Sequence, residues 1–186
     1  AAMVPASWLS VVASELAGTG IGVASALDFP TVGVMTSAGK AAEAAEIARL
    51  GATQLDIGVQ IGWLKSGMFD EFREDIAGVV RASGIPVKVM LELPLLTDAE
   101  KEAAVELAMD AGAAYLKNAS SGQIETANPA SIRYLVERAR KGVLVKASGS
   151  ITNYQQAVEL LDAGASLLAT SAALSIIAGN AATASY

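Results

Sequence analysis

The sequence of 186 residues fits one domain with a sizeable core, because 53% of its residues are hydrophobic and 17% are charged. A net charge of -6 argues against a surface for nucleic acid or an anionic membrane, since no basic field is present. Cys and His are both absent, which excludes disulfides, thiol nucleophiles and thiolate metal sites and leaves acid–base chemistry to carboxylates, lysine, tyrosine, hydroxyls or water. We therefore expect a single domain over residues 1–186 in a reducing compartment such as the cytoplasm.

Apolar periodicity predicts strands and helices that alternate along the chain. The expected strands span residues 1–4, 21–27, 53–59, 85–93, 114–117, 143–147 and 166–170. The expected helices span residues 5–17, 39–50, 70–82, 97–112, 128–140, 152–163 and 172–178. The first helix has an apolar stripe that predicts inward packing for Trp8, Leu9, Val12 and Leu16.

Local signals mark the ends of these helices. Thr97 with Glu100 has the form of a capping box, in which two side chains satisfy free N–H groups at a helix start, and Thr152 with Gln155 repeats it. A glycine ends five of the helices ahead of a strand, at positions 51, 84, 112, 142 and 164. The repeated order of helix, glycine, strand and loop predicts a parallel sheet.

The number and spacing of the strands indicate the architecture. Seven strands follow one another at intervals of roughly 24 to 32 residues, which is typical of consecutive βα units. We expect an α/β fold, a (β/α)8 TIM barrel in which the given chain starts at the second strand, because Ala1 stands directly before the first predicted strand. An open doubly wound sheet is the alternative.

Three lysines recur at an interval of 29 residues, and each lies in or ends an apolar run. Lysine is rarely buried, so Lys88, Lys117 and Lys146 need an explanation. Alternate residues of a barrel strand face the interior, and the strand neighbours of these lysines, like those of Asp56 and Glu92, are mainly aliphatic. We therefore expect all five ionisable side chains in one interior space, on four adjacent strands.

Three ammonium groups and two carboxylates cannot all be neutralised in pairs. Two ammonium groups about 5 Å apart repel by roughly 3 kcal/mol at an effective dielectric constant of about 20, enough to give one lysine a useful neutral fraction at neutral pH. A neutral lysine attacks an aldehyde or ketone to form a Schiff base, and this chemistry requires neither a metal nor an organic cofactor. The alternative is a structural network in which the lysines snorkel or pair with Asp56 and Glu92.

Several separated motifs share these strands and the loops that follow them. They are Leu55-Asp56-Ile57 with Ile61-Gly62, Lys88-Val89-Met90-Leu91-Glu92, Leu95-Leu96-Thr97, Ala111-Gly112-Ala113-Ala114-Tyr115-Leu116-Lys117 and Val145-Lys146-Ala147-Ser148-Gly149. Earlier in the chain, the same pattern continues with Phe29-Pro30, Gly33, Thr36, Lys40 and Glu43. Over essentially the whole chain these motifs resemble the deoxyribose-phosphate aldolase family, which consists of class I Schiff-base aldolases on a (β/α)8 barrel.

The resemblance implies a role for each matching residue. Lys117 would be the Schiff-base lysine, Lys146 the second lysine that favours its neutral form, and Asp56 the carboxylate of a proton relay, with Lys88 and Glu92 in support. The residues expected to bind substrate are Ser120, Ser148, Gly149, Ser150 and Ser171. The protein would then be a lyase of carbohydrate metabolism without cofactor or metal. Its expected partners are a small aldehyde, a ketone or a deoxy sugar, but no nucleic acid or membrane, and a homodimer is one assembly left open.

The sequence departs from the family where a phosphate would bind. Asn118-Ala119-Ser120-Ser121 stands where the family has Thr-Ser-Thr-Gly, and Gly149-Ser150 stands where it has two glycines. Ala169-Thr170-Ser171-Ala172 replaces a glycine–serine turn, so side chains at positions 150 and 169 predict an altered phosphate pocket. Two other functions remain: a Schiff-base barrel synthase or dehydratase acting on an unphosphorylated keto compound, and an inactive barrel that serves as a binding or assembly subunit.

Overall fold

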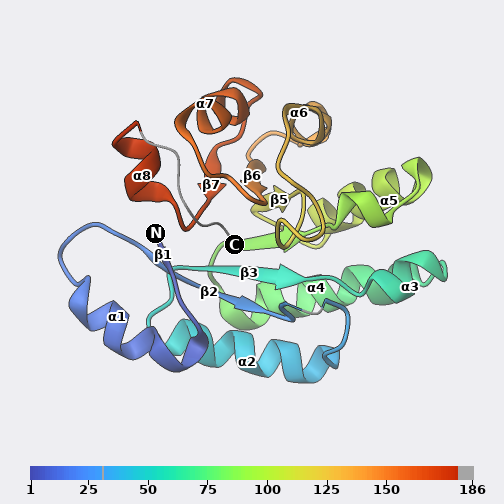
Figure 1. Cartoon of the computed structure of the whole chain (residues 1–186). Helices are drawn as coiled ribbons and strands as arrows, with labels where there is room; N and C mark the ends of the chain where they lie inside the picture. Colours follow the sequence, from blue (N-terminus) through green and yellow to red (C-terminus); the bar gives the residue numbers. More distant parts are fainter. Residues whose placement is uncertain (31, 180–186) are drawn as a thin grey trace. The chain divides into compact units, whose positions relative to one another are not determined.

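The computed structural model describes residues 1–30 and 32–179, and parallel strands alternate with helices along this part of the chain (Figure 1). The strands follow chain order in the sheet: β1 (Ala2–Met3), β2 (Val23–Leu27), β3 (Gln54–Gly58), β4 (Val87–Met90), β5 (Tyr115–Lys117), β6 (Leu144–Ser148) and β7 (Leu167–Ala169). The α-helices are α1 (Leu9–Glu15), α2 (Ser37–Arg49), α3 (Ile61–Lys65), α4 (Phe69–Ser83), α5 (Asp98–Asp110), α6 (Pro129–Arg138), α7 (Tyr154–Asp162) and α8 (Ala173–Ile177). The predicted α/β class is confirmed, and closure into a full (β/α)8 barrel stays a prediction.

The chain folds into two compact units. The first contains residues 1–89 and 106–114, and the second contains residues 90–105 and the chain from residue 115 onward. The expectation of a single domain stays a prediction. No helix within residues 1–30 and 32–179 combines the length and the apolar character needed to cross a membrane.

The first unit is built on β1, β2 and β3. These strands pair in parallel, with Ala2 opposite Val23 and Ala26 opposite Asp56. Helix α2 packs against α4 and against β2, as Figure 1 shows for the first unit. The buried face of α4 contains Phe72, Ile76 and Val79 at helical spacing, so this helix turns an amphipathic stripe toward the interior.

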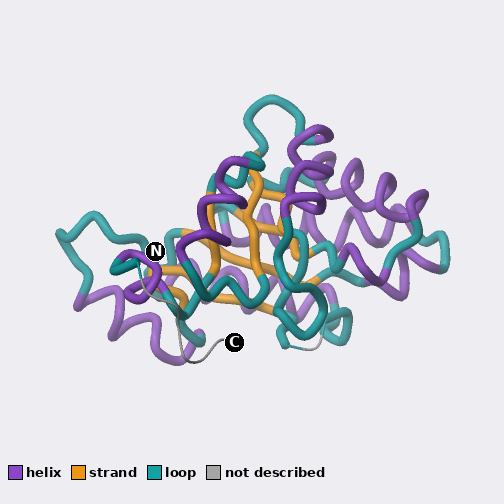
Figure 2. The backbone as a smooth tube through the Cα atoms, turned by 45° about the horizontal axis from the view of Figure 1, so that its top comes forward, coloured by secondary structure: helices purple, strands orange, loops and turns teal. Residues whose placement is uncertain are grey.

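The second unit contains β5, β6 and β7, with helices α6, α7 and α8. Lys117 of β5 lies opposite Lys146 of β6, and Ser148 of β6 lies opposite Ala169 of β7. Helix α6 packs on β6, while α7 packs on β7 and α8. Figure 2 shows the same succession of strands and helices along the backbone.

The predicted helix ends agree with the structure at most positions. The glycines at the five helix-to-strand turns have φ between +62° and +103°, the left-handed region in which glycine has no steric penalty. At the start of α5, the Thr97 N–H donates to Glu100 Oε2 at 2.8 Å and the Glu100 N–H donates to Thr97 Oγ1 at 3.3 Å. This capping box is confirmed.

Two predictions at helix starts were wrong. The N-cap of α7 is Asn153 and not Thr152, and the Asn153 Oδ1 accepts the Gln156 N–H at 2.9 Å. Asn is as good an N-cap residue as Thr, so the helix begins one residue later than predicted. Trp8 does not pack inside the protein, since its side chain is 58% exposed. Trp8 ends a 3₁₀ turn, η1 (Ala6–Trp8). Because a 3₁₀ turn is wound more tightly than an α-helix, the Trp8 side chain does not align with the apolar face of α1.

The fourth strand is shorter than predicted. Strand β4 ends at Met90, because Glu92 adopts a left-handed backbone with φ +53° and leads into a 3₁₀ turn, η2 (Leu93–Leu95). The short helix α3 was not predicted from the sequence. Both features lie where a strand passes into its following loop, and apolar periodicity does not distinguish a strand end from a buried turn.

Candidate active site

Asp56 and Lys88 form a buried ion pair in the first unit. Asp56 lies in β3 and Lys88 in β4, both side chains are fully buried, and Lys88 Nζ lies 3.3 Å from Asp56 Oδ1. Breaking such a pair leaves an uncompensated buried charge, so each side chain depends on the other. Lys88 is therefore a counter-ion for Asp56.

Lys117 and Lys146 lie opposite each other on two adjacent strands of the second unit, β5 and β6. Their strands are in parallel register at this position, and the two side chains are only 5% and 4% exposed. Neighbouring strands of a sheet lie about 4.8 Å apart, so the register brings two lysine side chains of adjacent strands to one level of the sheet. The 29-residue interval of the lysines thus corresponds to adjacent strands here.

Glu92 is a fully buried carboxyl group close to the end of β5. Its Oε1 accepts the Ser120 N–H at 3.0 Å, while Oε2 has no hydrogen-bond partner among the described residues. Burial raises the pKa of Glu92, and the Ser120 hydrogen bonds and the Lys117 charge offset part of this effect. The group therefore keeps its proton to a higher pH than an exposed glutamate does.

Asn118 follows Lys117 and binds the end of β6. Its Oδ1 accepts the Ser148 N–H at 2.9 Å, and its Nδ2 donates to the Ser148 carbonyl at 2.9 Å and to Glu125 Oε2 at 2.6 Å. Glu125 Oε1 in turn accepts from Asn128, the N-cap residue of α6, at 3.0 Å. From the sequence, Asn118 was predicted only as a departure from the family. Its hydrogen bonds to Ser148 were not predicted, because the two residues are 30 positions apart in the chain.

The expected substrate-binding residues lie at or just beyond the carboxyl ends of β5, β6 and β7. Ser120 and Ser148 are buried, whereas Ser171 is exposed. The Gly149 carbonyl accepts the Ala127 N–H at 2.9 Å. Ser150 has φ +48°, a left-handed conformation that disfavours a side chain, and a Cβ added at Gly122 would collide with the Ser150 hydroxyl. The turn after β6 is thus closely covered by the loop after β5.

The ionisable side chains form separate groups in the two units. Asp56 pairs with Lys88 in the first unit, and Lys117 is in register with Lys146 in the second. The expected gathering of all five in one space stays a prediction, as do their catalytic roles.

A buried cluster in the first unit was missed from the sequence. Lys40 Nζ lies 3.0 Å from Asp28 Oδ2, 2.8 Å from Asp75 Oδ2 and 3.0 Å from the Gly58 carbonyl, and the lysine is fully buried. Lys40 shares the buried face of α2 with Ala44 and Ile47. That spacing of three, four and seven residues was the signal that could have placed it inside.

Asp28 also organises the loop that follows β2. Its carboxylate accepts the N–H groups of Gly33, Val34 and Met35 at 2.9, 3.0 and 3.3 Å. A carboxylate that accepts several backbone hydrogen bonds fixes the path of a loop, because each bond orients one peptide. Asp28 therefore links Lys40 to the loop.

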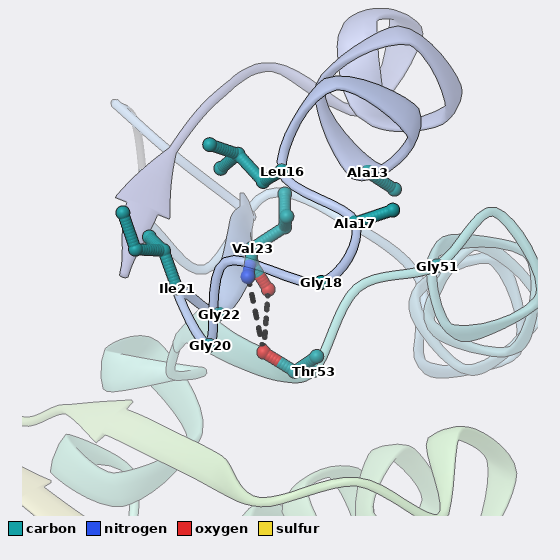
Figure 3. Close-up of a pocket in the computed structure, with 10 residues that line it drawn as sticks. All are labelled: Ala13, Leu16, Ala17, Gly18, Gly20, Ile21, Gly22, Val23, Gly51 and Thr53. Atoms are coloured by element: carbon teal, nitrogen blue, oxygen red, sulfur yellow. Dashed lines mark hydrogen bonds between the residues drawn. The ribbon is translucent and has the colours of Figure 1, made fainter.

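A pocket of about 330 Å³ lies elsewhere in the first unit and holds no ionisable side chain (Figure 3). Small and apolar residues line it, among them Leu16, Ile21 and Val23. Thr53 contributes a hydroxyl that already exchanges two hydrogen bonds of 3.1 Å with the Val23 backbone. The pocket lies at the amino ends of β2 and β3, the opposite ends from the loops that carry catalysis in parallel α/β folds.

No three His, Cys, Asp or Glu side chains of residues 1–30 and 32–179 form a group that could hold a metal ion.

Several deoxyribose-phosphate aldolases are similar to this chain in sequence and in structure. No family model matches the chain. The deoxyribose-phosphate aldolase of Thermosynechococcus vestitus is 39% identical over 170 residues, which cover 91% of this chain and 77% of that protein. That of Enterococcus faecalis is 38% identical over 174 residues, 92% of this chain and 79% of that protein. A solved deoxyribose phosphate aldolase from Aeropyrum pernix, described as tetrameric, has a TM-score of 0.84 at 27% identity, over 95% of this chain and 75% of that one.

Proposed function

The chain belongs to the deoxyribose-phosphate aldolase family and is a class I aldolase, an aldehyde-lyase that works through a lysine Schiff base, and we propose that Lys117 is that lysine. The observation that carries the proposal is the parallel register of Lys117 with Lys146, two nearly buried lysines on adjacent strands. A neighbouring positive charge favours the neutral, nucleophilic form of an amine.

The proposed reaction begins when the Lys117 Nζ lone pair attacks the substrate carbonyl carbon and the C=O π electrons move to oxygen. Proton transfer and loss of that oxygen as water give a protonated imine. In the cleavage direction, the β-hydroxyl loses its proton and the bond between the α and β carbons breaks. Its electron pair moves into the imine to form an enamine, and the β carbon leaves as an aldehyde. The enamine carbon then takes a proton, and water releases the second carbonyl product and free Lys117.

The other charged residues take supporting roles in this proposal. Lys146 favours the neutral form of Lys117, and Asp56 passes protons with the help of water. Ser120 assists with its hydroxyl near the reacting carbons. Lys88 balances the charge of Asp56, a role supported by their distance of 3.3 Å. Glu92 holds the Ser120 backbone in place through a hydrogen bond of 3.0 Å.

The proposed substrate is a deoxy sugar or a small aldehyde or ketone, bound through Ser120, Ser148, Gly149, Ser150 and Ser171. We propose that the phosphate pocket of the family is altered in this chain. Two features of the turn after β6 support this: the side chain of Ser150 at φ +48°, and the close approach of its hydroxyl to Gly122 in the loop after β5. A phosphate cradle needs bare backbone N–H groups, which a side chain obstructs.

We propose that the parallel strands form part of a (β/α)8 barrel, and that the protein is a cytoplasmic homodimer. The relative from Aeropyrum pernix is described as tetrameric, which supports self-association but not a particular number of chains. Light scattering of the purified protein distinguishes the outcomes, because a mass of two chains supports the dimer and a mass of one or four chains contradicts it.

The decisive experiment is reduction with borohydride in the presence of small aldehydes or ketones, followed by peptide mass mapping. Reduction converts the imine into a stable secondary amine, so the modified lysine retains the carbon skeleton of the carbonyl compound. We expect the adduct on Lys117. An adduct on Lys146 would overturn the assignment, and no adduct with any carbonyl compound would favour an inactive binding subunit.

Product analysis separates the two enzymatic functions. Release of acetaldehyde from a deoxy sugar is the result expected of the aldolase. A protein that forms the Lys117 adduct but dehydrates or condenses an unphosphorylated keto compound would instead be a synthase or dehydratase. The same analysis with phosphorylated and unphosphorylated deoxyribose compares the two substrate classes directly.

A further inference from the structure

The Asn118 side chain continues the hydrogen bonding between β5 and β6 beyond the two lysines. Strand β5 ends at Lys117, which lies opposite Lys146. Two residues further along β6, the Ser148 N–H and C=O both bind the Asn118 amide at 2.9 Å. An amide has one acceptor oxygen and two donor hydrogens, so it replaces a backbone peptide in this exchange.

Three neighbouring residues hold Asn118 in place. Its backbone carbonyl accepts the Leu93 N–H at 3.0 Å, and its second amide hydrogen binds Glu125 at 2.6 Å. Asn118 is fully buried, so water does not compete for these bonds. Its amide plane is therefore fixed, and with it the position of Ser148 relative to the end of β5.

We propose that Asn118 is a positioning residue for the Schiff-base lysine, which extends the β5–β6 pairing past Lys117 and thereby sets the separation of Lys117 and Lys146. This inference rests on the proposed role of Lys117. Coulomb repulsion between two ammonium groups depends on their distance, so a change in strand spacing changes how readily the nucleophile becomes neutral. Asn118 acts through Lys117 and has no contact with the reacting atoms in this proposal.

The test measures the rate of reductive trapping on Lys117 with acetaldehyde and cyanoborohydride as a function of pH. Asn118→Ala removes the amide and frees the two strand ends. We expect the trapping rate at neutral pH to fall about 10- to 100-fold, the loss typical of a misplaced catalytic group. We also expect the pH profile of trapping to move toward higher pH, because repulsion from Lys146 weakens as the two lysines separate. The kcat of the aldol reaction should fall more than KM rises.

Asn128→Ala is the matched control. Asn128 binds the same Glu125 carboxylate and caps α6, but none of its hydrogen bonds within residues 1–30 and 32–179 reaches Ser148. This variant should lose thermal stability and keep the pH profile of the parent protein. A purely structural role of Asn118 would give the Asn118 variant the same behaviour.

Folding and the underlying assignment are tested separately. Asn118→Ser keeps a small polar side chain at this position, so it provides a second variant if Asn118→Ala does not fold. A folded Asn118 variant whose trapping rate and pH midpoint equal those of the parent would overturn the inference. Failure of the parent protein to form any adduct on Lys117 would overturn the proposed function itself, and the two failures are therefore distinguishable.

Discussion

Lysines are buried in both units, but their surroundings differ. In the first unit, Lys40 has three acceptors within 3.0 Å, two of them carboxylates. In the second unit, Lys117 lies in register with another lysine, Lys146, and the buried carboxyl group nearby, Glu92, has a raised pKa. The first arrangement surrounds the Lys40 amine with acceptors, while the second places two lysine side chains on adjacent strands.

The difference shows that burial by itself does not make a lysine reactive. A buried ammonium with a complete set of acceptors is stabilised in its charged form, and it then serves the fold. A lysine beside a second cation is a better nucleophile, because neutralising one of the two relieves their repulsion. The comparison predicts that removing Lys40 harms stability first, whereas removing Lys117 harms catalysis first.

Lys117→Met provides the largest expected effect. The substitution removes the proposed nucleophile and retains an apolar chain of similar length. We expect kcat/KM of the aldol reaction to fall more than about 10,000-fold, equivalent to about 5.5 kcal/mol in the barrier. Steady-state kinetics measure the loss, and circular dichroism checks the fold. Lys141→Met, at an exposed position, is the control, and residual activity above one per cent in Lys117→Met would contradict the assignment.

Lys40→Met tests the first unit. It leaves Asp28 and Asp75 buried without their cation, so we expect the free energy of unfolding to fall by about 3–5 kcal/mol in urea titrations. Lys101→Met is the control: it breaks an ion pair of 3.0 Å with Asp98, whose side chain is 97% exposed. The control should lose less than about 1 kcal/mol. Equal losses in the two variants would remove the distinction between them.

Ser150→Gly tests the altered phosphate pocket of the second unit. Glycine tolerates the φ of +48° and removes the side chain from the turn after β6. We expect the ratio of kcat/KM for deoxyribose 5-phosphate over deoxyribose to rise about tenfold, or about 1.4 kcal/mol. Ser150→Ala keeps a Cβ at the same backbone position and should gain less. An unchanged ratio in Ser150→Gly would mean that Ser150 does not limit phosphate binding.

Glu92→Gln has the smallest expected effect, and it appears in the pH dependence of stability. Because folding raises the pKa of Glu92 above 4.5, the folded protein binds a proton that the unfolded chain has released. The parent protein should therefore lose stability relative to Glu92→Gln as pH rises from 4.5 through the raised value. Urea titrations at several pH values measure the difference. Glu71→Gln, at an exposed position, is the control, and a difference independent of pH would contradict the prediction.

The sequence predicted the features that repeat along the chain. The 29-residue interval of the lysines corresponds to neighbouring strands, as the register of Lys117 with Lys146 shows. Helix-ending glycines and the Thr97 capping box were predicted because such signals are local. Trp8 was placed wrongly because a 3₁₀ turn and an α-helix differ in winding but share their apolar composition.

Alternation of strands and helices, the absence of Cys and His, and the lysines in apolar strands were all determined by the sequence itself. Only the tertiary structure decided which buried groups meet: Lys40 with Asp75, and Asn118 with Ser148. The residues of these pairs are 35 and 30 positions apart in the chain. The local sequence pattern determines the spacing of strands and helices and the geometry of their turns. The desolvation of a side chain and its hydrogen-bond partners depend on segments that only the folded chain brings together.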